Sequence, residues 1–289
     1  MVDNVSTADT MPSALDTWRA IVVARQQQMD AAYAALHRTS ADFWDRRADR
    51  FRAMGQRLPE DDLGLRLLRR LTDPGSTVLD VGAGAGRYAR AIAPHVRRVV
   101  AVEPNGALVA DLRTDVAADG LTNVEVVEAR WEEADVGPAD LVLCSHVLYP
   151  HAEIEAFVHK LDTHVRRTCL ILATAAWREP ALLLALWQRF HGEPRRGQPD
   201  AHHVFNVLYE MDIFPNVEAA PARGSMWTFD SVEDAVPACR EHLILPADPE
   251  IDATLDAELR AALSPTPDGR LTLPDRPRII AGLWWQRGE

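Results

Sequence analysis

The sequence has few cysteines, no long apolar run and a deficit of positive charge. Its three cysteines are widely spaced and odd in number, which argues against a disulfide framework and favours a reducing, cytoplasmic location. The longest apolar stretch, residues 181–187, falls far short of the ~20 residues that cross a membrane, and the acidic first residues predict no signal peptide. Lys and Arg number 31 against 43 Asp and Glu, and the net charge of -12 disfavours nucleic-acid partners.

The chain of 289 residues changes its hydrophobic period near residue 71. Before that point, apolar residues such as Trp18 and Val22 recur at helical spacing, which predicts an N-terminal helical cap over residues 1–70. After it, short runs rich in Val, Leu and Ile alternate with helical stretches, a pattern typical of βαβ units in a parallel sheet covered on both faces. Five strands are expected at 77–81, 98–103, 123–128, 139–144 and 168–173.

The section after the fifth strand is less regular. We expect one α/β domain over residues 71–289, in which residues 177–213 form a helical insertion that acts as a lid at the carboxyl edge of the sheet. The remaining pattern predicts helices at 177–191, 201–212, 231–242 and 252–263 and strands at 216–229 and 277–285.

Three glycines follow the first strand at alternate positions: Gly82, Gly84 and Gly86. Glycines there let the backbone turn sharply and approach a ligand where a Cβ would collide. A dinucleotide fingerprint would need its third glycine where Arg87 stands. Asp80, two residues before the first glycine, would repel a pyrophosphate but suits a ligand that carries an ammonium and a sulfonium.

A second carboxylate, Glu103, ends the second strand. At that place it can accept hydrogen bonds from both hydroxyls of a ribose bound across the glycine loop, and it rejects a 2′-phosphate. Asp80, the glycines and Glu103 together point to a nucleoside ligand without a pyrophosphate.

Four segments carry a family resemblance: VLDVGAGAGRYA (78–89), VVAVEPN (99–105), VEVVEARWEE (124–133) and ADLVLCSHVLYP (139–150). They resemble the class I S-adenosylmethionine-dependent methyltransferases over roughly residues 75–175 and the edge strands after 215. The resemblance implies a Rossmann-like, seven-stranded, mostly parallel sheet with helices on both faces and an antiparallel last strand at 279–285. It also implies S-adenosyl-L-methionine as methyl donor and S-adenosyl-L-homocysteine as product.

The resemblance implies roles for the residues around the glycine loop. The three glycines would line the methionine part of the cofactor, Asp80 would orient its amino group, and Glu103 would hold the ribose, with Pro104 beside it. The family often has an acidic residue near the adenine; here Arg130 and Trp131 stand at that place, and Trp131 is expected to pack on the adenine.

Further cofactor contacts are implied at the fourth strand and near the N-terminus. Ser145 and His146 match positions where backbone groups meet the methionine end and where the substrate enters. Residues 42–51 resemble a helix that covers the cofactor, with Trp44 and Arg47 facing the pocket and Arg47 meeting the cofactor carboxylate. The alternative for this segment is an amphipathic helix with a solvated charged face.

The histidines leave alternatives open. His146 is either a general base or a packed loop residue, and His151 is either a base or the cap of the following helix. His202 and His203 are either part of an acceptor pocket, with Tyr209 and Glu210, or ordinary helix residues. We expect no metal site, because adjacent histidines on a helix point about 100° apart.

The sequence thus predicts a methyltransferase that transfers a methyl group to an O, N, S or C nucleophile of a small molecule by in-line displacement. An apolar acceptor pocket is expected from five aromatic residues: Trp177, Trp187, Phe190, Phe205 and Tyr209. The alternatives are an RNA methyltransferase, a non-catalytic S-adenosylmethionine-binding module and an NAD-dependent oxidoreductase. The oligomeric state stays open, with a homodimer through Trp284 and Trp285 as one option.

Overall fold

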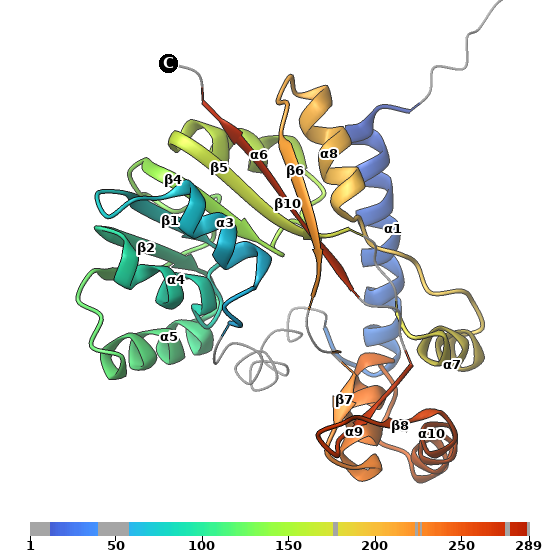
Figure 1. Ribbon diagram of the computed structural model, residues 1–289. Coiled ribbons are helices and arrows are strands. Elements are labelled where there is room, and N and C mark those ends of the chain that lie inside the picture. The colour runs from blue at the N-terminus through green and yellow to red at the C-terminus, as the bar shows by residue number, and fades with distance from the viewer. Residues whose placement is uncertain are drawn as a thin grey trace, which may run out of the picture.

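A seven-stranded sheet forms the centre of the computed structural model, which describes residues 12–39, 58–175, 179–222, 225, 227–274 and 278–287 (Figure 1). The strand order is β3-β2-β1-β4-β5-β10-β6, and β10 is antiparallel to both of its neighbours. The strands are β1 (Thr77–Val81), β2 (Arg98–Glu103), β3 (Val124–Glu128), β4 (Ala139–Ser145), β5 (Val165–Thr174), β6 (Asn216–Pro221) and β10 (Ile279–Gln286). The predicted Rossmann-like sheet with an antiparallel last strand is confirmed.

Helices cover both faces of this sheet, so its central strands are apolar on both sides. Three helices share one apolar layer with the sheet: α3 (Leu63–Leu71), α4 (Arg87–Ile92) and α5 (Gly106–Ala118). A 3₁₀ turn, η2 (Ala93–His95), follows α4. The opposite layer contains α1 (Ala14–Ala35), α6 (Ile154–Thr163) and α8 (Ala201–Glu210). Along β4, Leu141 and Leu143 belong to the first layer, and Val142 and Cys144 to the second.

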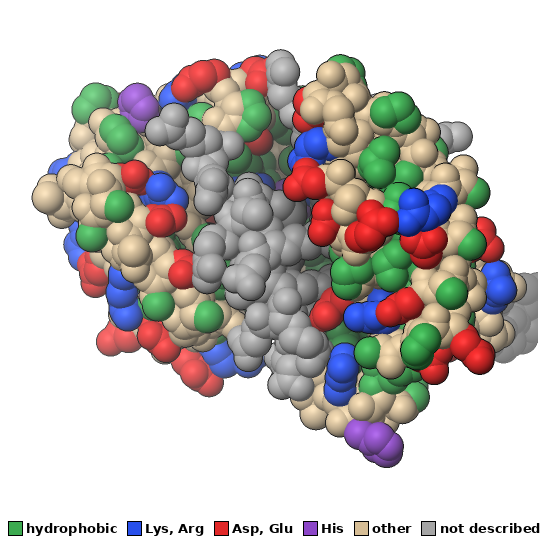
Figure 2. All heavy atoms as spheres, turned by 90° about the horizontal axis from the view of Figure 1, so that it is seen from below, with side chains coloured by type: hydrophobic (Ala, Val, Ile, Leu, Met, Phe, Trp, Pro, Cys, Tyr) green, Lys and Arg blue, Asp and Glu red, His purple; other side chains and the backbone are tan. Residues whose placement is uncertain are grey.

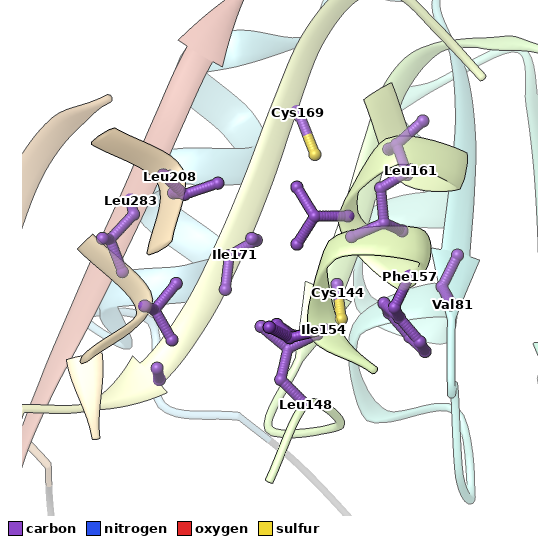
Figure 3. Packing of buried hydrophobic residues seen from close by; sticks show 14 of the residues in the cluster. Val81, Cys144, Leu148, Ile154, Phe157, Leu161, Cys169, Ile171, Leu208 and Leu283 are labelled. Carbon is purple, nitrogen blue, oxygen red and sulfur yellow. The ribbon is translucent and has the colours of Figure 1, made fainter. Parts of the chain in front are cut away.

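Figure 3 shows part of the second layer, with Phe157 and Leu161 of α6 close to Cys144 of β4 and Ile171 of β5. Cys144, Cys169 and Cys239 are all buried, and none forms a disulfide with another described residue. No described helix combines the length and the apolar character needed to cross a bilayer.

Helix α1 runs along α8 and α6 and belongs to two apolar clusters (Figure 1). Near its start, Trp18 is fully buried and its indole Nε1 donates to the backbone oxygen of His151 at 2.7 Å. Near its end, Tyr33 packs among the C-terminal elements. Helices are therefore confirmed at both ends of the expected N-terminal cap, while residues 42–51 lie outside the described part.

The C-terminal elements form a third apolar cluster and a small sheet of their own in the order β7-β9-β8. They comprise α7 (Ala181–His191), β7 (Thr228–Phe229), α9 (Val232–His242), α10 (Pro249–Ala262), β8 (Ser264–Pro265) and β9 (Leu271–Thr272). Capping residues set the helix starts: Ser231 accepts from the Asp234 N–H before α9, and Asp248 caps α10 ahead of Pro249.

The prediction of one strand over residues 216–229 is wrong. β6 ends at Pro221 on the edge of the main sheet, and β7 pairs with β9 in the small sheet. Proline cannot donate to a ladder, so it is tolerated on an edge strand but favours an end to pairing there. The predicted tryptophan pair packs within the chain, since Trp285 Nε1 donates to Asp162 Oδ1 at 2.8 Å and Arg70 lies over the Trp284 ring.

Candidate cofactor and acceptor site

The glycine loop turns between β1 and α4 in the left-handed region of backbone space. Gly82, Gly84 and Gly86 have φ of 70°, 57° and 78°. A Cβ on Gly82 would lie 2.3 Å from Val147 Cγ2, and one on Gly86 would lie 2.1 Å from Leu112 Cδ1, so packing requires glycine at both places. A Cβ on Gly84 would meet no described atom within 4 Å. Among the described residues, therefore, nothing closes the space beside the middle glycine, and a ligand could approach the backbone there.

Glu103 lies at this open turn, at the end of β2. Its carboxylate is 7% exposed; Oε2 accepts the Gly84 N–H at 2.9 Å and Oε1 accepts the Asn105 N–H at 3.0 Å. Burial raises the pKa of Glu103, and the two backbone donors act against that rise. Each oxygen has a second lone pair, so the carboxylate can still accept two hydroxyl hydrogens from a ribose.

Asp80 lies in β1, four residues before Gly84. Asp80 is only 2% exposed. Burial raises the pKa of its carboxyl group to about 7, although the charge of Arg87 acts to lower it. A buried carboxyl group of this kind becomes more acidic when a cationic ligand group comes near.

The ends of β4 and β5 complete the carboxyl edge. Arg87, the first residue of α4, donates to Ser145 Oγ at 3.3 Å. His146 follows with φ of 61°, and its Nδ1 lies 2.9 Å from the Tyr149 hydroxyl. That hydroxyl accepts the backbone N–H of Thr174, the last residue of β5, at 2.9 Å. Burial and the charges of Arg87 and Arg278 lower the pKa of His146 well below its usual value.

The structure thus brings together seven predicted residues and two neighbours that sequence patterns do not indicate. Asp80, the glycines, Glu103, Ser145 and His146 lie at adjoining strand ends, as expected. Tyr149 and Thr174 are the two neighbours that the sequence does not indicate. Their contact joins two strand ends that are 25 residues apart in sequence, which local patterns do not reveal.

The expected packing of Trp131 on the adenine is not supported. Its side chain is 4% exposed and lies against Phe157 and edge-on to His164, with ring centroids 5.0 Å apart in the latter pair. Lys160 Nζ lies 4.7 Å from the indole ring and donates to the Trp131 backbone oxygen. The ring is therefore part of the apolar layer under α6. Arg130 is exposed, with its Nε 3.9 Å from Glu132.

His151 does not cap α6, because the N-cap residue is Glu153. Its Nδ1 lies 3.2 Å from Glu132 Oε1 and its ring packs against Phe157. Burial lowers the pKa of His151, and the charge of Glu132 acts in the other direction. Through Glu132 and Phe157, this histidine contacts both the segment after β3 and helix α6.

The four described aromatic residues of the expected acceptor pocket do not converge. Trp187 is buried in the C-terminal cluster, and Phe190 packs against that cluster. Phe205 and Tyr209 stack on the outer face of α8, where Tyr209 is 59% exposed. α7 and α8 pack on different cores, which separates the two pairs. Trp177, Trp44 and Arg47 lie outside the described residues.

The histidine pair of α8 has structural contacts. His203 completes a capping box with Asp200, whose Oδ1 lies 2.8 Å from His203 Nδ1. His202 Nε2 lies 2.9 Å from Asn206. Glu210 of the same helix accepts the Ala14 N–H at the start of α1. Within the described parts of the chain, no group of three or more His, Cys, Asp and Glu could hold a metal ion.

Comparison with known proteins agrees with this geometry. Residues 78–168, from β1 into β5, match a family model described as a methyltransferase domain. These residues are therefore similar to a methyltransferase domain. The match spans the glycine loop, Glu103 and His146, whereas Thr174 lies beyond it.

One curated protein and one solved structure are similar to parts of this chain. A 55-residue segment is 44% identical to protein-L-isoaspartate O-methyltransferase from Methanoregula boonei and covers 19% of this chain and 25% of that protein. The chain thus matches only a quarter of the length of this relative. A solved structure from Bacillus halodurans, provisionally named as a methyltransferase, superposes with a TM-score of 0.55 over 80% of this chain and 100% of that chain. At 14% identity, it shows a shared fold.

Proposed function

We propose that the chain is an S-adenosylmethionine-dependent methyltransferase that acts on a small molecule. The observation that carries the proposal is the open space at Gly84, with the Glu103 carboxylate bonded to the Gly84 N–H at 2.9 Å. A nucleoside ribose fits there because its hydroxyls can donate to the carboxylate while the glycine lets it approach the backbone.

The surrounding residues fit the rest of this cofactor. Asp80 is a buried carboxyl group at the same turn and suits the ammonium of the methionine part. Pro104 is exposed directly after Glu103, and Ser145 ends β4 beside Arg87. S-adenosylmethionine supplies a methyl carbon on a sulfonium; the protein's residues bind it, align it with the acceptor and exclude water.

The charge distribution supports a small-molecule acceptor. The chain has a net charge of -12. Figure 2 shows acidic and basic side chains intermixed among the coloured residues on the face seen from below, with no broad basic patch in view. A nucleic acid would be held mainly through its phosphates and would need such a patch.

Calorimetric titration with S-adenosylhomocysteine tests the proposal, with NAD as the control ligand. We expect micromolar binding of the first and no binding of the second. Glu103→Ala should weaken binding by roughly 1–3 kcal/mol, the size of hydrogen bonds to a charged group. Glu125→Ala is the matched control, because Glu125 is an exposed carboxylate on neighbouring β3 that pairs with Arg98.

Each contrary result points to a different function. Binding of NAD alone would favour an oxidoreductase. Tight S-adenosylhomocysteine binding without turnover on any acceptor would favour a non-catalytic binding module. RNA binding that weakens steeply with salt would favour an RNA methyltransferase.

A further inference from the structure

His146 is held firmly at the end of β4 by its backbone. Its φ of 61° is uncommon for a residue with a Cβ, and its backbone N–H donates to the Leu172 oxygen of β5 at 2.9 Å. The next residue, Val147, packs against Gly82 of the glycine loop. The imidazole is therefore placed between the glycine loop and the end of β5, at the carboxyl edge of the sheet where ligands of α/β folds bind.

The Tyr149 hydroxyl has three polar neighbours, and the direction of its own hydrogen sets the tautomer of His146. The hydroxyl has one hydrogen and two lone pairs. It accepts the Thr174 N–H at 2.9 Å, donates to Thr174 Oγ1 at 3.4 Å, and lies 2.9 Å from His146 Nδ1. With its hydrogen directed to Thr174, its second lone pair is filled by a hydrogen on His146 Nδ1. The lone pair of the imidazole is then on Nε2, for which no described residue is a hydrogen-bond partner.

We propose that Tyr149 and Thr174 hold His146 as the Nδ1–H tautomer, so that its Nε2 acts as general base toward an acceptor hydroxyl. This rests on the proposed methyltransferase function and narrows the acceptor to alcohols and phenols, whose nucleophilic oxygen must lose a proton. His146 is the catalytic residue of the proposal, and Tyr149 is a positioning residue.

The step balances without a further reactant. The acceptor oxygen forms a bond to the methyl carbon, the bond from that carbon to sulfur breaks, and its electron pair stays on sulfur. The hydroxyl proton goes to His146 Nε2 and then to solvent. An oxygen that gains a carbon substituent becomes strongly acidic, so a weak base suffices at that moment.

The surroundings keep the imidazole uncharged, so that a nitrogen lone pair is present to accept that proton. Arg87 from α4 and Arg278 from the segment before β10 face it, and together with burial they lower the pKa of His146 well below the usual value. Tyr149, the titratable neighbour on its own loop, is itself held neutral because burial raises its pKa. His146 is therefore uncharged at neutral pH.

The tautomer can be read directly by NMR on protein labelled with ¹⁵N-histidine. The chain has 10 histidines, and the signals of His146 are those missing from His146→Gln. We expect a neutral Nδ1–H imidazole that stays neutral at about pH 5.5, where an exposed histidine is mostly protonated. Tyr149→Phe should shift the population toward Nε2–H, and Tyr209→Phe, which changes an exposed tyrosine on α8, should not.

A neutral Nε2–H form in the wild type, or a tautomer unaffected by Tyr149→Phe, would overturn the proposal. The NMR readout needs no cofactor, so it is separable from the proposed function. Protein that shows the Nδ1–H tautomer yet fails to bind S-adenosylhomocysteine would contradict the methyltransferase function alone.

The acceptor class is tested by methyl transfer from radiolabelled S-adenosylmethionine to phenol and to thiophenol at pH 8. Thiophenol is already ionised there and needs no base. His146→Gln should slow transfer to phenol at least tenfold and leave transfer to thiophenol within twofold. Transfer to thiophenol alone, equal effects on both, or transfer to neither by protein that binds S-adenosylhomocysteine would contradict the hydroxyl acceptor.

Discussion

At the scale of single residues, we expect the protonation of Asp80 to link cofactor binding to pH. Burial raises its pKa to about 7 from 3.8, so the folded chain without ligand holds a proton there at mildly acidic pH. Holding this proton more tightly in the folded state than in the unfolded state stabilises the fold. The stabilisation is fully present below pH 3.8 and is lost as pH rises through about 7. A bound ammonium favours the opposite, charged form.

We therefore expect the affinity for S-adenosylhomocysteine to fall by up to about tenfold per unit as pH decreases below 7, because binding must release the proton. Asp80→Asn should bind more weakly and lose this dependence. Calorimetry from pH 5.5 to 8, in two buffers of different ionisation enthalpy, measures both affinity and proton release. A pH-independent affinity of the wild type would contradict the role of Asp80.

Gly84 gives a second residue-scale prediction with a close control. Gly84 and Gly120 have φ of 57° and 66°, and a Cβ on either would meet no described atom within 4 Å. Alanine at each should cost about 1–2 kcal/mol of unfolding free energy through backbone strain alone. Only Gly84→Ala should lose S-adenosylhomocysteine binding. Urea denaturation and calorimetry on both variants check this; equal loss of binding would place the ligand elsewhere.

The residues that sequence could identify are those whose role depends on local chain geometry. Gly84 and Glu103 follow strands that the apolar pattern marks, so their meeting at the carboxyl edge can be predicted. Trp131 follows a strand in the same way, but sequence does not show on which side of the chain its ring packs. Tyr149 and Thr174 meet through one hydrogen bond between two strand ends, for which no periodic signal exists.

At the scale of elements, a buried group of charges joins four segments. Glu179, before α7, lies 3.1 Å from Arg195 and 3.3 Å from His242 of α9, while Arg25 of α1 is 4.0 Å away. The Glu179 and Arg195 side chains are each 2% exposed. Burial acts to raise the pKa of Glu179, but the hydrogen bond from His242 and the charges of Arg195, His242 and Arg25 outweigh it and lower the pKa to about 2.

Breaking this group should destabilise the fold. Glu179→Gln leaves buried positive charge uncompensated and should cost about 3–5 kcal/mol at pH 7. The contribution of Glu179 is present above its unfolded pKa of 4.5 and is lost as pH falls toward 2, so the variant should depend less on pH in that range. Glu258→Gln is the control, because its pair with Arg189 is exposed and should contribute about 0–1 kcal/mol.

Urea denaturation at several pH values measures both variants. Equal costs for Glu179→Gln and Glu258→Gln would show that the buried charges contribute no more than surface ones.

Elements were predicted well where their hydrophobic period is long and poorly where strands are short. The five parallel strands and the α5 helix follow from runs of Val, Leu and Ile. The two-residue strands β7, β8 and β9 leave no period to detect, and their pairing depends on the core under α9 and α10. This is why the apolar stretch from 216 to 229 was interpreted as one strand.

At the scale of the whole molecule, α1 should make unfolding cooperative. It contributes Trp18 to the core of the main sheet and Tyr33 to the C-terminal core. We expect a single calorimetric transition. S-adenosylhomocysteine at 100 times its Kd should stabilise the fold by about 2.7 kcal/mol and raise the Tm by roughly 4–8 °C. Two transitions, of which the ligand moves only one, would show that the cores melt independently.

Helix α1 also sets the distance between the two residues that anchor it. Trp18 and Tyr33 are 15 positions apart, and a helix rises ~1.5 Å per residue, so their anchoring points are about 22 Å apart along the axis. The number of residues in α1 therefore sets the distance between the two cores. Because a helix does not stretch, this spacing between the two cores is fixed, and inserting one turn would increase it by about 5.4 Å.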